Sequence, residues 1–248
     1  MLNPPLTPFE QTSDYLRDRG YAVMSPASLG KLIGFDLIEL ETLKSFWHDL
    51  PRDPYLKDGG HYRSRRHGSY QVKHASTLEL MPHRAHWQPV TYNALHGGIE
   101  RWFEPLQASL VSNHVWQAIL LKISGLLNSI DPSNQWFIEA HPFRIDTTGG
   151  IGRPTPEGAH RDGVDYVAVI LVDRIGVKGG ETRVFEAQGS IGLRFTLEES
   201  WTMLLLNDAR MIHETTPIQP IGETGYRDTL VITFRKQGFQ EPIGKDQQ

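Results

Sequence analysis

Two histidines and an aspartate in the second half of the chain have the residue types and spacing of a metal site. One residue separates His160 from Asp162, and His213 lies far along the chain, after an apolar segment and a turn-like Asn-Asp pair. Residues two apart in an extended segment point to the same side, so His160 and Asp162 would face one point. Because the chain has no cysteine, any metal must be held by His, Asp, Glu or backbone groups.

This ligand set indicates a particular kind of metal chemistry. Two neutral imidazoles and one carboxylate leave three octahedral positions open, which suits iron(II) with a chelating cosubstrate and oxygen. A zinc hydrolase would more often place three protein ligands around one water, with a general base nearby. The tripeptide His-x-Asp also occurs by chance in many proteins, and most histidines in β-rich proteins are hydrogen-bonded structural residues. The set therefore needs support from elsewhere in the sequence.

An arginine that begins the last apolar segment gives this support. Alternation along residues 227–235 puts Arg227 and Thr229 on one face of a strand. An arginine that faces a barrel interior needs a carboxylate partner, and its planar fork fits one bidentately. The Thr229 hydroxyl could donate a hydrogen bond to the same anion. The alternative is an ordinary salt bridge to Asp228 or Glu223.

The elements that must position these residues divide the chain into a helical first half and a strand-rich second half. A buried helical stripe is predicted from apolar residues three and four apart, namely Leu40, Leu43, Trp47 and Leu50. A second helix should follow Asn113 as its cap. Its apolar side would be Val115, Trp116, Ile119, Leu120, Ile123 and Leu127.

From Trp136 onward, short segments rich in β-branched and aromatic residues alternate with turn residues. The predicted strands are Trp136–Ile145, Tyr166–Val172, Thr182–Glu186, Trp201–Leu206 and Thr229–Phe234. Many short strands at this spacing indicate a sandwich or jelly roll. No linker separates the halves, so we expect one α+β domain over residues 1–248. Its helices should lie mainly in residues 1–130 and its β core mainly in residues 136–236.

With these elements in place, His160-x-Asp162, His213 and Arg227 resemble the 2-oxoglutarate/iron(II)-dependent dioxygenases. The segment from Pro156 to Gly163, with Gly179-Gly180-Glu181 after the next strand, is similar to one branch of that family. That branch contains bacterial hydroxylases of free L-amino acids, such as the isoleucine dioxygenase group. The resemblance covers most of the chain. It implies a double-stranded β-helix (jelly-roll) core buttressed by N-terminal helices.

The resemblance also implies the cofactors and a role for each residue. Fe(II) would be held by His160, Asp162 and His213, with 2-oxoglutarate as cosubstrate and O2 as oxidant. Arg227 and Thr229 would bind the distal carboxylate of 2-oxoglutarate. Its oxidative decarboxylation to succinate would drive hydroxylation of an aliphatic C–H in a small carboxylate-bearing substrate, a free L-amino acid.

Four further residues are candidates for binding the substrate. Arg63 and Arg65 are two apart in a basic cluster and would face the same way, towards a substrate carboxylate. A solvated basic loop is an equally good interpretation. His141 shares a strand face with Glu139 and could line the barrel mouth. Glu157 either orders the loop ahead of the first metal ligand or binds a substrate amine.

Three other polar residues have simpler interpretations. His83 and His86 are three apart in a proline-bounded loop, where a second metal site is one interpretation and ordinary surface histidines are the simpler one. Asp208, near the second histidine of the metal set, fits a capping or turn role.

Composition limits the remaining classes of function. Apolar residues make up 39% of the chain and aromatic residues 10%, enough for a folded core. The net charge of −4 disfavours nucleic-acid binding. Neither a signal-peptide pattern nor a membrane-length apolar run is present, so we expect a cytoplasmic enzyme that acts on a small molecule. The sequence leaves the oligomeric state open.

Two alternatives to the dioxygenase reading use the same metal residues. One is a jelly-roll metal-binding regulatory protein without turnover. The other is a cupin-like metalloenzyme that does not use 2-oxoglutarate. Arg227 favours the dioxygenase, because a protein without a dicarboxylate cosubstrate would not require it.

Overall fold

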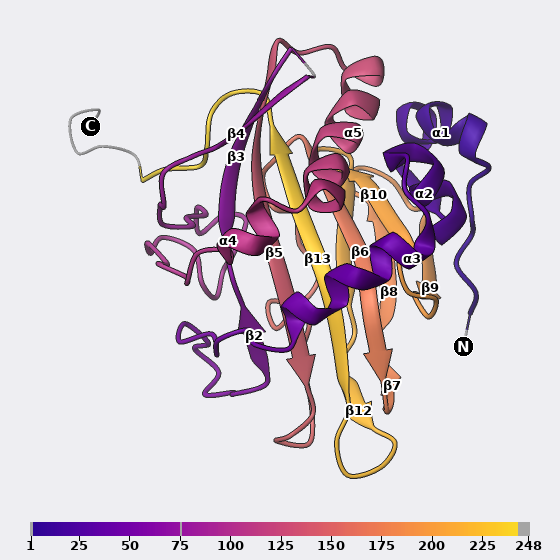
Figure 1. The fold of residues 1–248 in the computed structure, drawn as a ribbon. Helices are drawn as coiled ribbons and strands as arrows, with labels where there is room; N and C mark the ends of the chain where they lie inside the picture. The colour runs from indigo at the N-terminus through magenta and orange to yellow at the C-terminus, as the bar shows by residue number, and fades with distance from the viewer. Residues whose placement is uncertain (1, 75, 243–248) are drawn as a thin grey trace.

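The computed structural model describes residues 2–74 and 76–242, in which helices pack on one side of a large antiparallel sheet (Figure 1). The helical segments are η1 (Phe9–Gln11), α1 (Thr12–Arg19), α2 (Pro26–Ile33), α3 (Leu37–Glu41), η2 (Thr42–Trp47), α4 (Ala108–Val111) and α5 (His114–Ile130). None of the described helices is long and apolar enough to cross a membrane.

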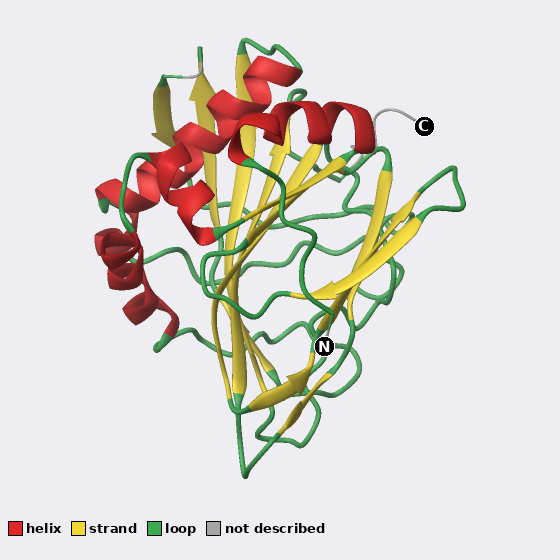
Figure 2. Cartoon of the chain, turned by 90° about the vertical axis from the view of Figure 1, so that its right-hand side faces the viewer, coloured by secondary structure: helices red, strands yellow, loops and turns green. Residues whose placement is uncertain are grey.

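The helix predicted after Asn113 is confirmed as α5. The Asn113 side chain accepts hydrogen bonds from the backbone amides of Val115 and Trp116, which satisfies donors that a helix start leaves open. Every residue predicted for its apolar side is buried. The helix therefore lies with this side against the large sheet, as Figure 2 shows edge-on.

The helix predicted around Leu40 is only partly right. An α-helix begins at a capping box formed by Asp36 and Glu39, but it ends at Glu41 and the chain continues as the 3-10 helix η2. Three of the four stripe residues are nevertheless buried, namely Leu40, Leu43 and Trp47. The indole Nε1 of Trp47 donates to the Thr229 carbonyl at 3.1 Å, which fixes this segment to the strand that carries Arg227.

The strands form one large sheet and two small ones. The large sheet has the order β1-β10-β6-β13-β5-β3-β4, with β2 also paired to β5, and the small sheets have the orders β11-β8-β9 and β12-β7. The strands are β1 (Tyr21–Met24), β2 (Arg63–Arg65), β3 (Gly68–Lys73), β4 (Thr77–Leu80), β5 (Gln135–Asp146), β6 (Tyr166–Ile175), β7 (Val177–Gly179), β8 (Glu181–Glu186), β9 (Gly192–Thr196), β10 (Met203–Asn207), β11 (Met211–Thr215), β12 (Ile218–Pro220) and β13 (Tyr226–Arg235).

Each of the five predicted strands is present, with shifted ends. Strands β5, β6 and β13 run further than predicted, because β13 pairs with β5 on one side and with β6 on the other over long stretches in the middle of the sheet. Strand β10 starts later than predicted. Trp201 has a positive φ of 70° and precedes the strand, which begins only at Met203.

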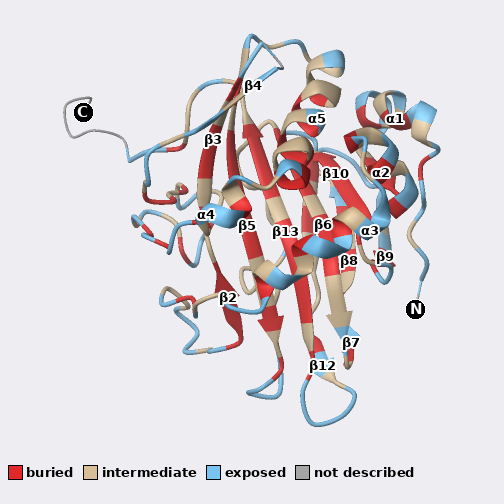
Figure 3. Ribbon diagram, viewed as in Figure 1, coloured by how far each residue is buried: buried red, intermediate tan, exposed pale blue. Residues whose placement is uncertain are grey.

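The large sheet buries a different set of side chains on each face. On β13, Leu230, Ile232 and Phe234 belong to the core between the sheet and the helices. A second core lies between this sheet and β11-β8-β9, formed by residues such as Val167, Val184 and Phe195. Figure 3 shows the burial running along the central strands. The predicted alternation on β13 is confirmed, and the face opposite the helices is left to line a pocket.

Candidate active site

His160 and His213 meet through their backbones. The His160 amide donates to the His213 carbonyl at 3.1 Å, and the His213 amide donates back at 2.9 Å. His213 lies on β11, where it pairs with Val184 of β8. This bridge places the two imidazole rings 4.7 Å apart, centre to centre. Two histidines distant in the sequence are therefore held side by side by the sheet itself.

Asp162 is positioned by a turn rather than by a strand, which differs from the extended segment expected. Gly163 has a φ of 75°, and a Cβ at this position would lie 2.4 Å from the Tyr92 ring. The Asp208 carboxylate accepts the backbone amides of Asp162, Gly163 and Val164 at 2.8–3.1 Å. The capping role predicted for Asp208 is thus confirmed, and it fixes the loop that presents Asp162.

The side chains of the three residues converge on one point. His160 Nε2 lies 3.8 Å from Asp162 Oδ1, and His213 Nε2 lies 3.7 Å from Asp162 Oδ2. One donor atom from each residue falls within a group whose members are all within 4.8 Å of one another. Metal–ligand bonds of ~2.0–2.2 Å can be reached from these positions by small side-chain rotations. The three residues could therefore hold one metal ion.

Hydrogen bonding fixes the tautomer of His160, and the pKa values of His160 and His213 are shifted in opposite directions. His160 Nδ1 lies 2.9 Å from the Gly158 carbonyl, so it carries the proton and Nε2 presents a lone pair. Burial and the neighbouring His160 lower the pKa of His213 to about 4. Burial also acts on His160, but the carboxylates of Asp162 and Glu157 raise its pKa. A neutral imidazole is the form that binds a metal.

Arg227 and Thr229 face the same pocket as the three metal-site residues. Arg227 is 2% exposed, and its Nε and Nη2 atoms are buried without a hydrogen-bond partner among the described residues. The alternative of a salt bridge to Asp228 is wrong, because Asp228 is paired with Arg144. Burial and Arg174 lower the pKa of Arg227 to about 10. It therefore stays positive at neutral pH and has room for an anion.

Strand pairing places Arg63 and Arg65 of β2 at the same level of the sheet as Arg227 and Thr229 of β13. Ile145 of β5 is the register partner of both Arg63 and Arg227, one on each side. Phe143 is likewise the partner of both Arg65 and Thr229. Neighbouring strands are ~4.8 Å apart, so the two sets of side chains lie about two strand spacings apart on one face. Both sets line the same pocket.

The interpretation of Arg63 and Arg65 as a solvated loop is wrong, because they are 5% and 4% exposed. Arg63 Nε donates to Asp53 at 2.7 Å, and its Nη2 is buried without a partner among the described residues. The Arg65 guanidinium carbon lies 3.8 Å from the Phe103 ring centre and 4.2 Å from that of Phe143. Both side chains are held rigidly at the pocket wall.

His141 and Glu157 also line the pocket. His141 Nδ1 lies 2.6 Å from Arg65 Nη2. A guanidinium only donates, so Nδ1 is the acceptor and the proton of the neutral ring is on Nε2. Glu157 lies beside the metal-site residues, with Oε1 3.5 Å from His160 Nε2. Its Oε2 is buried and has no partner among the described residues.

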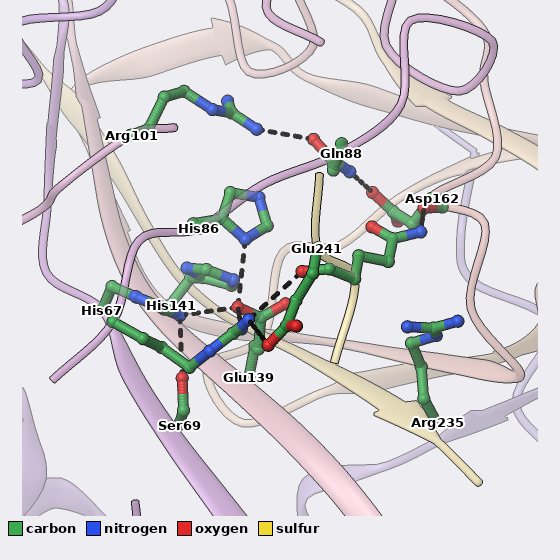
Figure 4. A network of polar contacts seen from close by, with 12 residues as sticks. His67, Ser69, His86, Gln88, Arg101, Glu139, His141, Asp162, Arg235 and Glu241 are labelled. Atoms are coloured by element: carbon green, nitrogen blue, oxygen red, sulfur yellow. Dashed lines mark hydrogen bonds and ion pairs between the residues drawn. The ribbon is translucent and has the colours of Figure 1, made fainter. Parts of the chain in front are cut away.

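A second group of potential metal ligands contains His67, His86, Glu139 and His141, all of them buried (Figure 4). Glu139 Oε1 already accepts from His67 at 2.9 Å and lies 3.3 Å from His86 Nδ1. The cationic side chain of Arg84 is 3.4 Å from the same oxygen. These contacts satisfy this oxygen of Glu139 and place one guanidinium beside it, so the group is a hydrogen-bonded network rather than a metal site.

This network corrects two expectations about histidines. His86 is 6% exposed and is not a surface residue. His83 does not join it, because its Nε2 contacts the Phe103 carbonyl at 2.9 Å. A metal site shared by His83 and His86 is therefore wrong.

Sequence reasoning missed several buried pocket residues, among them Gln88 and Arg101, which are 6% and 2% exposed. Both lie in a segment of irregular backbone, where no periodicity marks an inward-facing side chain. The available signal was weak: Gln88 stands two residues after His86, and Arg101 stands directly before Trp102 and Phe103.

Comparison with known proteins places these observations in a family context. Residues 44–233 match a family model described as 2OG-Fe dioxygenase. A bsmA homolog from Methylobium petroleophilum PM1 is 50% identical, with 97% of this chain and 98% of that chain covered and a TM-score of 0.92. IDO from Bacillus thuringiensis is 18% identical, with coverage of 96% and 100% and a TM-score of 0.74.

A third similar structure is the Fe(II)/(alpha)ketoglutarate-dependent dioxygenase TqaL, which is 18% identical. It covers 96% of this chain and 88% of its own, with a TM-score of 0.70. The two structures at 18% identity show a shared fold. A comparison with curated protein sequences gave no significant match.

Proposed function

Because the chain belongs to the 2OG-Fe dioxygenase family, we propose that it hydroxylates an aliphatic C–H of a free L-amino acid. It is an oxidoreductase whose family uses Fe(II), 2-oxoglutarate and O2. We further propose that the antiparallel sheets form a double-stranded β-helix, or jelly roll. Residues 1–248 would then be one catalytic domain.

The metal site we assign is His160, Asp162 and His213. The observation that supports this is the donor set, in which two imidazole Nε2 atoms lie 3.7–3.8 Å from the Asp162 carboxylate oxygens and one donor atom of each residue lies within 4.8 Å of the others. When bound, iron(II) activates O2 and couples the oxidative decarboxylation of 2-oxoglutarate to C–H hydroxylation. The His160–Gly158 hydrogen bond keeps one imidazole in the tautomer that a metal needs.

Arg227 carries the assignment of the cosubstrate site. A buried guanidinium without a carboxylate partner is strongly destabilising unless an anion fills the site. The distal carboxylate of 2-oxoglutarate would accept from the free Nε and Nη2 of Arg227. The Thr229 side chain, two residues along the same face, would add a hydroxyl donor.

The opposite side of the pocket fits the two charges of an amino acid. Arg63 Nη2 and Arg65 Nε are buried without partners among the described residues, and they would bind the substrate carboxylate. The free Oε2 of Glu157 would accept from the substrate ammonium. The Nε2–H of His141 is a further donor to the carboxylate. The apolar side chains of Ile145, Val169 and Val231 line the pocket and would contact an aliphatic side chain.

Position then selects the carbon that reacts. If the arginines fix the carboxylate at the pocket wall, the C–H that reaches the metal lies some carbons away from it. The bound substrate and the sheet that lines the pocket would together exclude water from this space. The protein contributes binding, orientation and exclusion of water, while the oxidation chemistry comes from the cofactors.

A turnover assay tests this proposal. Anaerobically purified protein would be mixed with iron(II), 2-oxoglutarate and air, and screened against a panel of free L-amino acids. Succinate and a product heavier by one oxygen are expected by mass spectrometry, and neither is expected from Asp162→Ala. Succinate without any oxygenated amino acid would reject the substrate class alone. Iron binding without 2-oxoglutarate consumption would instead favour a metal-binding protein or an enzyme independent of 2-oxoglutarate.

A further inference from the structure

Two buried side chains, Gln88 and Arg101, extend in a hydrogen-bonded chain from the half-buried Asp162 (Figure 4). Arg101 Nη2 donates to Gln88 Oε1 at 2.8 Å, and Gln88 Nε2 donates to Asp162 Oδ1 at 3.1 Å. All three line the pocket. No carboxylate of the described residues forms a salt bridge with Arg101, so Gln88 Oε1 is the acceptor that the structure gives this guanidinium.

The direction of each hydrogen bond in this chain is fixed by its neighbours. A guanidinium can only donate, so the Gln88 atom that faces Arg101 must be the amide oxygen. Asn93 Nδ2 donates to the same oxygen at 3.1 Å. Asn93 is oriented in turn by the His96 backbone amide, which donates to its Oδ1 at 2.7 Å. The amide nitrogen of Gln88 therefore has to face Asp162.

This arrangement makes the two oxygens of Asp162 unequal. Both oxygens lie near an imidazole, Oδ1 at 3.8 Å from His160 Nε2 and Oδ2 at 3.7 Å from His213 Nε2, but Oδ1 also accepts the Gln88 hydrogen bond. An oxygen already engaged by a donor is a poorer metal ligand, so the free oxygen is favoured. The geometry points to Gln88 as a positioning residue that keeps Asp162 a one-oxygen ligand, with Arg101 fixing the orientation of Gln88. This inference rests on the proposed metal site.

A single-oxygen carboxylate matters because the site must keep positions open. A carboxylate that bound through both oxygens would take one of the three positions that two imidazoles and one carboxylate leave free. These positions are needed for a chelating cosubstrate and for oxygen. Gln88 would thus protect the coordination capacity of the site.

The backbone around Gln88 does not depend on its side chain. His86 and Arg101 form reciprocal backbone hydrogen bonds at 2.9 and 3.0 Å, which close the segment between them. Within it, the Gly98 amide donates to the Gln88 carbonyl at 2.8 Å. Replacing the side chain should therefore leave the fold in place, so a change at the metal can be separated from unfolding.

The test uses Co(II) alone, titrated into the metal-free protein and followed by visible absorption. Gln88→Met keeps the length of the side chain and removes its donor, and it should weaken Co(II) binding 10- to 100-fold and change the spectrum of the bound ion. The matched control is Gln71→Met. Gln71 lies on β3, donates a side-chain hydrogen bond to Gln135 at 2.8 Å and does not line the pocket. The control should bind Co(II) as the wild type does, with the same spectrum.

A second variant separates positioning from a purely structural role. Gln88→Glu keeps an acceptor for Arg101 and Asn93 but has no N–H for Asp162, so its Co(II) spectrum should also change. Thermal denaturation of the metal-free Gln88→Glu variant should stay close to that of the wild type. Gln88→Met takes the acceptor away from the buried Arg101, so it should melt at a lower temperature while still unfolding cooperatively. Wild-type affinity and spectra in both Gln88 variants would overturn this inference and leave the proposed function standing. Failure of the wild type itself to bind Co(II) would instead reject the proposed metal site.

Discussion

The guanidinium of Arg144 donates to both oxygens of the Asp228 carboxylate, from Nε to Oδ1 at 2.8 Å and from Nη2 to Oδ2 at 2.6 Å. The two residues are register partners on β5 and β13. Asp228 follows Arg227 in the chain, so it points to the opposite face of the strand. The nearest carboxylate in the sequence is thus withheld from Arg227, which remains available to a ligand.

Arg227→Ala should therefore weaken binding of 2-oxoglutarate. Truncating one partner of a buried charge pair costs about 2–5 kcal/mol, which would appear as a large rise in the KM for 2-oxoglutarate. Arg227→Lys should recover only part of the loss, because an ammonium cannot form the bidentate fork. Isothermal titration with 2-oxoglutarate under anaerobic conditions would measure both variants.

Arg235→Ala is the matched control for this experiment. Arg235 lies on the same strand, but its Nη1 donates to the Gly238 carbonyl and it does not line the pocket. Its removal should leave the affinity for 2-oxoglutarate unchanged. Normal affinity in Arg227→Ala would show that another residue binds the cosubstrate.

Asp208→Ala should damage the metal site without touching a ligand. The change leaves three backbone amides of the Asp162 loop without their acceptor, at about 1–3 kcal/mol for each that water does not reach. We expect a lower free energy of unfolding in urea and weaker metal binding. Asp208→Asn retains one acceptor oxygen, so its stability and metal affinity should lie between those of Asp208→Ala and those of the wild type. Equal metal affinity in all three proteins would contradict this role.

Arg63→Met and Arg65→Met should separate substrate use from cosubstrate use. Both side chains have a free buried nitrogen that we assign to the substrate carboxylate. The KM for the amino acid should rise about tenfold or more, since one such contact is worth at least ~1.4 kcal/mol. Consumption of 2-oxoglutarate without substrate should change little. A parallel loss of both activities would place these arginines in the general structure of the pocket.

The stability of the protein should fall as the pH drops below about 6.5. Burial lowers the pKa of His67, His86 and His141. The pKa of His86 falls to about 4, because burial and the charges of Arg101 and Arg65 outweigh the opposing charge of Glu139. Between the lowered pKa of the folded protein and the ordinary histidine pKa of about 6.5, the unfolded chain therefore binds more protons than the folded one. Stability is complete above the unfolded pKa and is lost as the pH falls towards the folded one.

Each unit of lowered pKa corresponds to about 1.4 kcal/mol, so the loss attributable to His86 should approach ~3 kcal/mol near pH 4. Urea denaturation at a series of pH values would measure it. His86→Gln keeps an amide donor for Glu139 and should make the profile flatter. An unchanged slope in this variant would mean that His86 does not contribute to the acid sensitivity.

The proposed metal-site residues could be recognised from their types and spacing, whereas the wall around them could not. The spacing of His160 and Asp162 indicated a shared target, and a strand before His213 indicated that it could reach them. The extended segment assumed for Asp162 is instead a turn held by Asp208. Gln88 and Arg101 lie in irregular backbone whose path is set by hydrogen bonds to distant segments. No periodic pattern records such contacts, so these two residues could be found only from the structure.

The fold shows the same division. The long strands could be predicted because β-branched and aromatic residues mark them and alternation assigns their faces. The short strands β7 and β12 carry too few residues to show a pattern. The order of the sheet, in which β13 lies between β5 and β6, depends on contacts between distant segments. Local propensity cannot specify such neighbours.

The reciprocal backbone hydrogen bonds between His160 and His213 have a consequence for metal selection. Two of the three ligands that we propose are held together by the polypeptide before any ion arrives, so the folding of the chain does not choose the metal. Among divalent ions, Cu(II) and Zn(II) generally bind nitrogen and oxygen ligands more tightly than Fe(II) does. Occupancy of the site by Fe(II) must therefore depend on which ions the cell supplies. A trace of Cu(II) or Zn(II) should displace Fe(II) and abolish activity while leaving the structure intact.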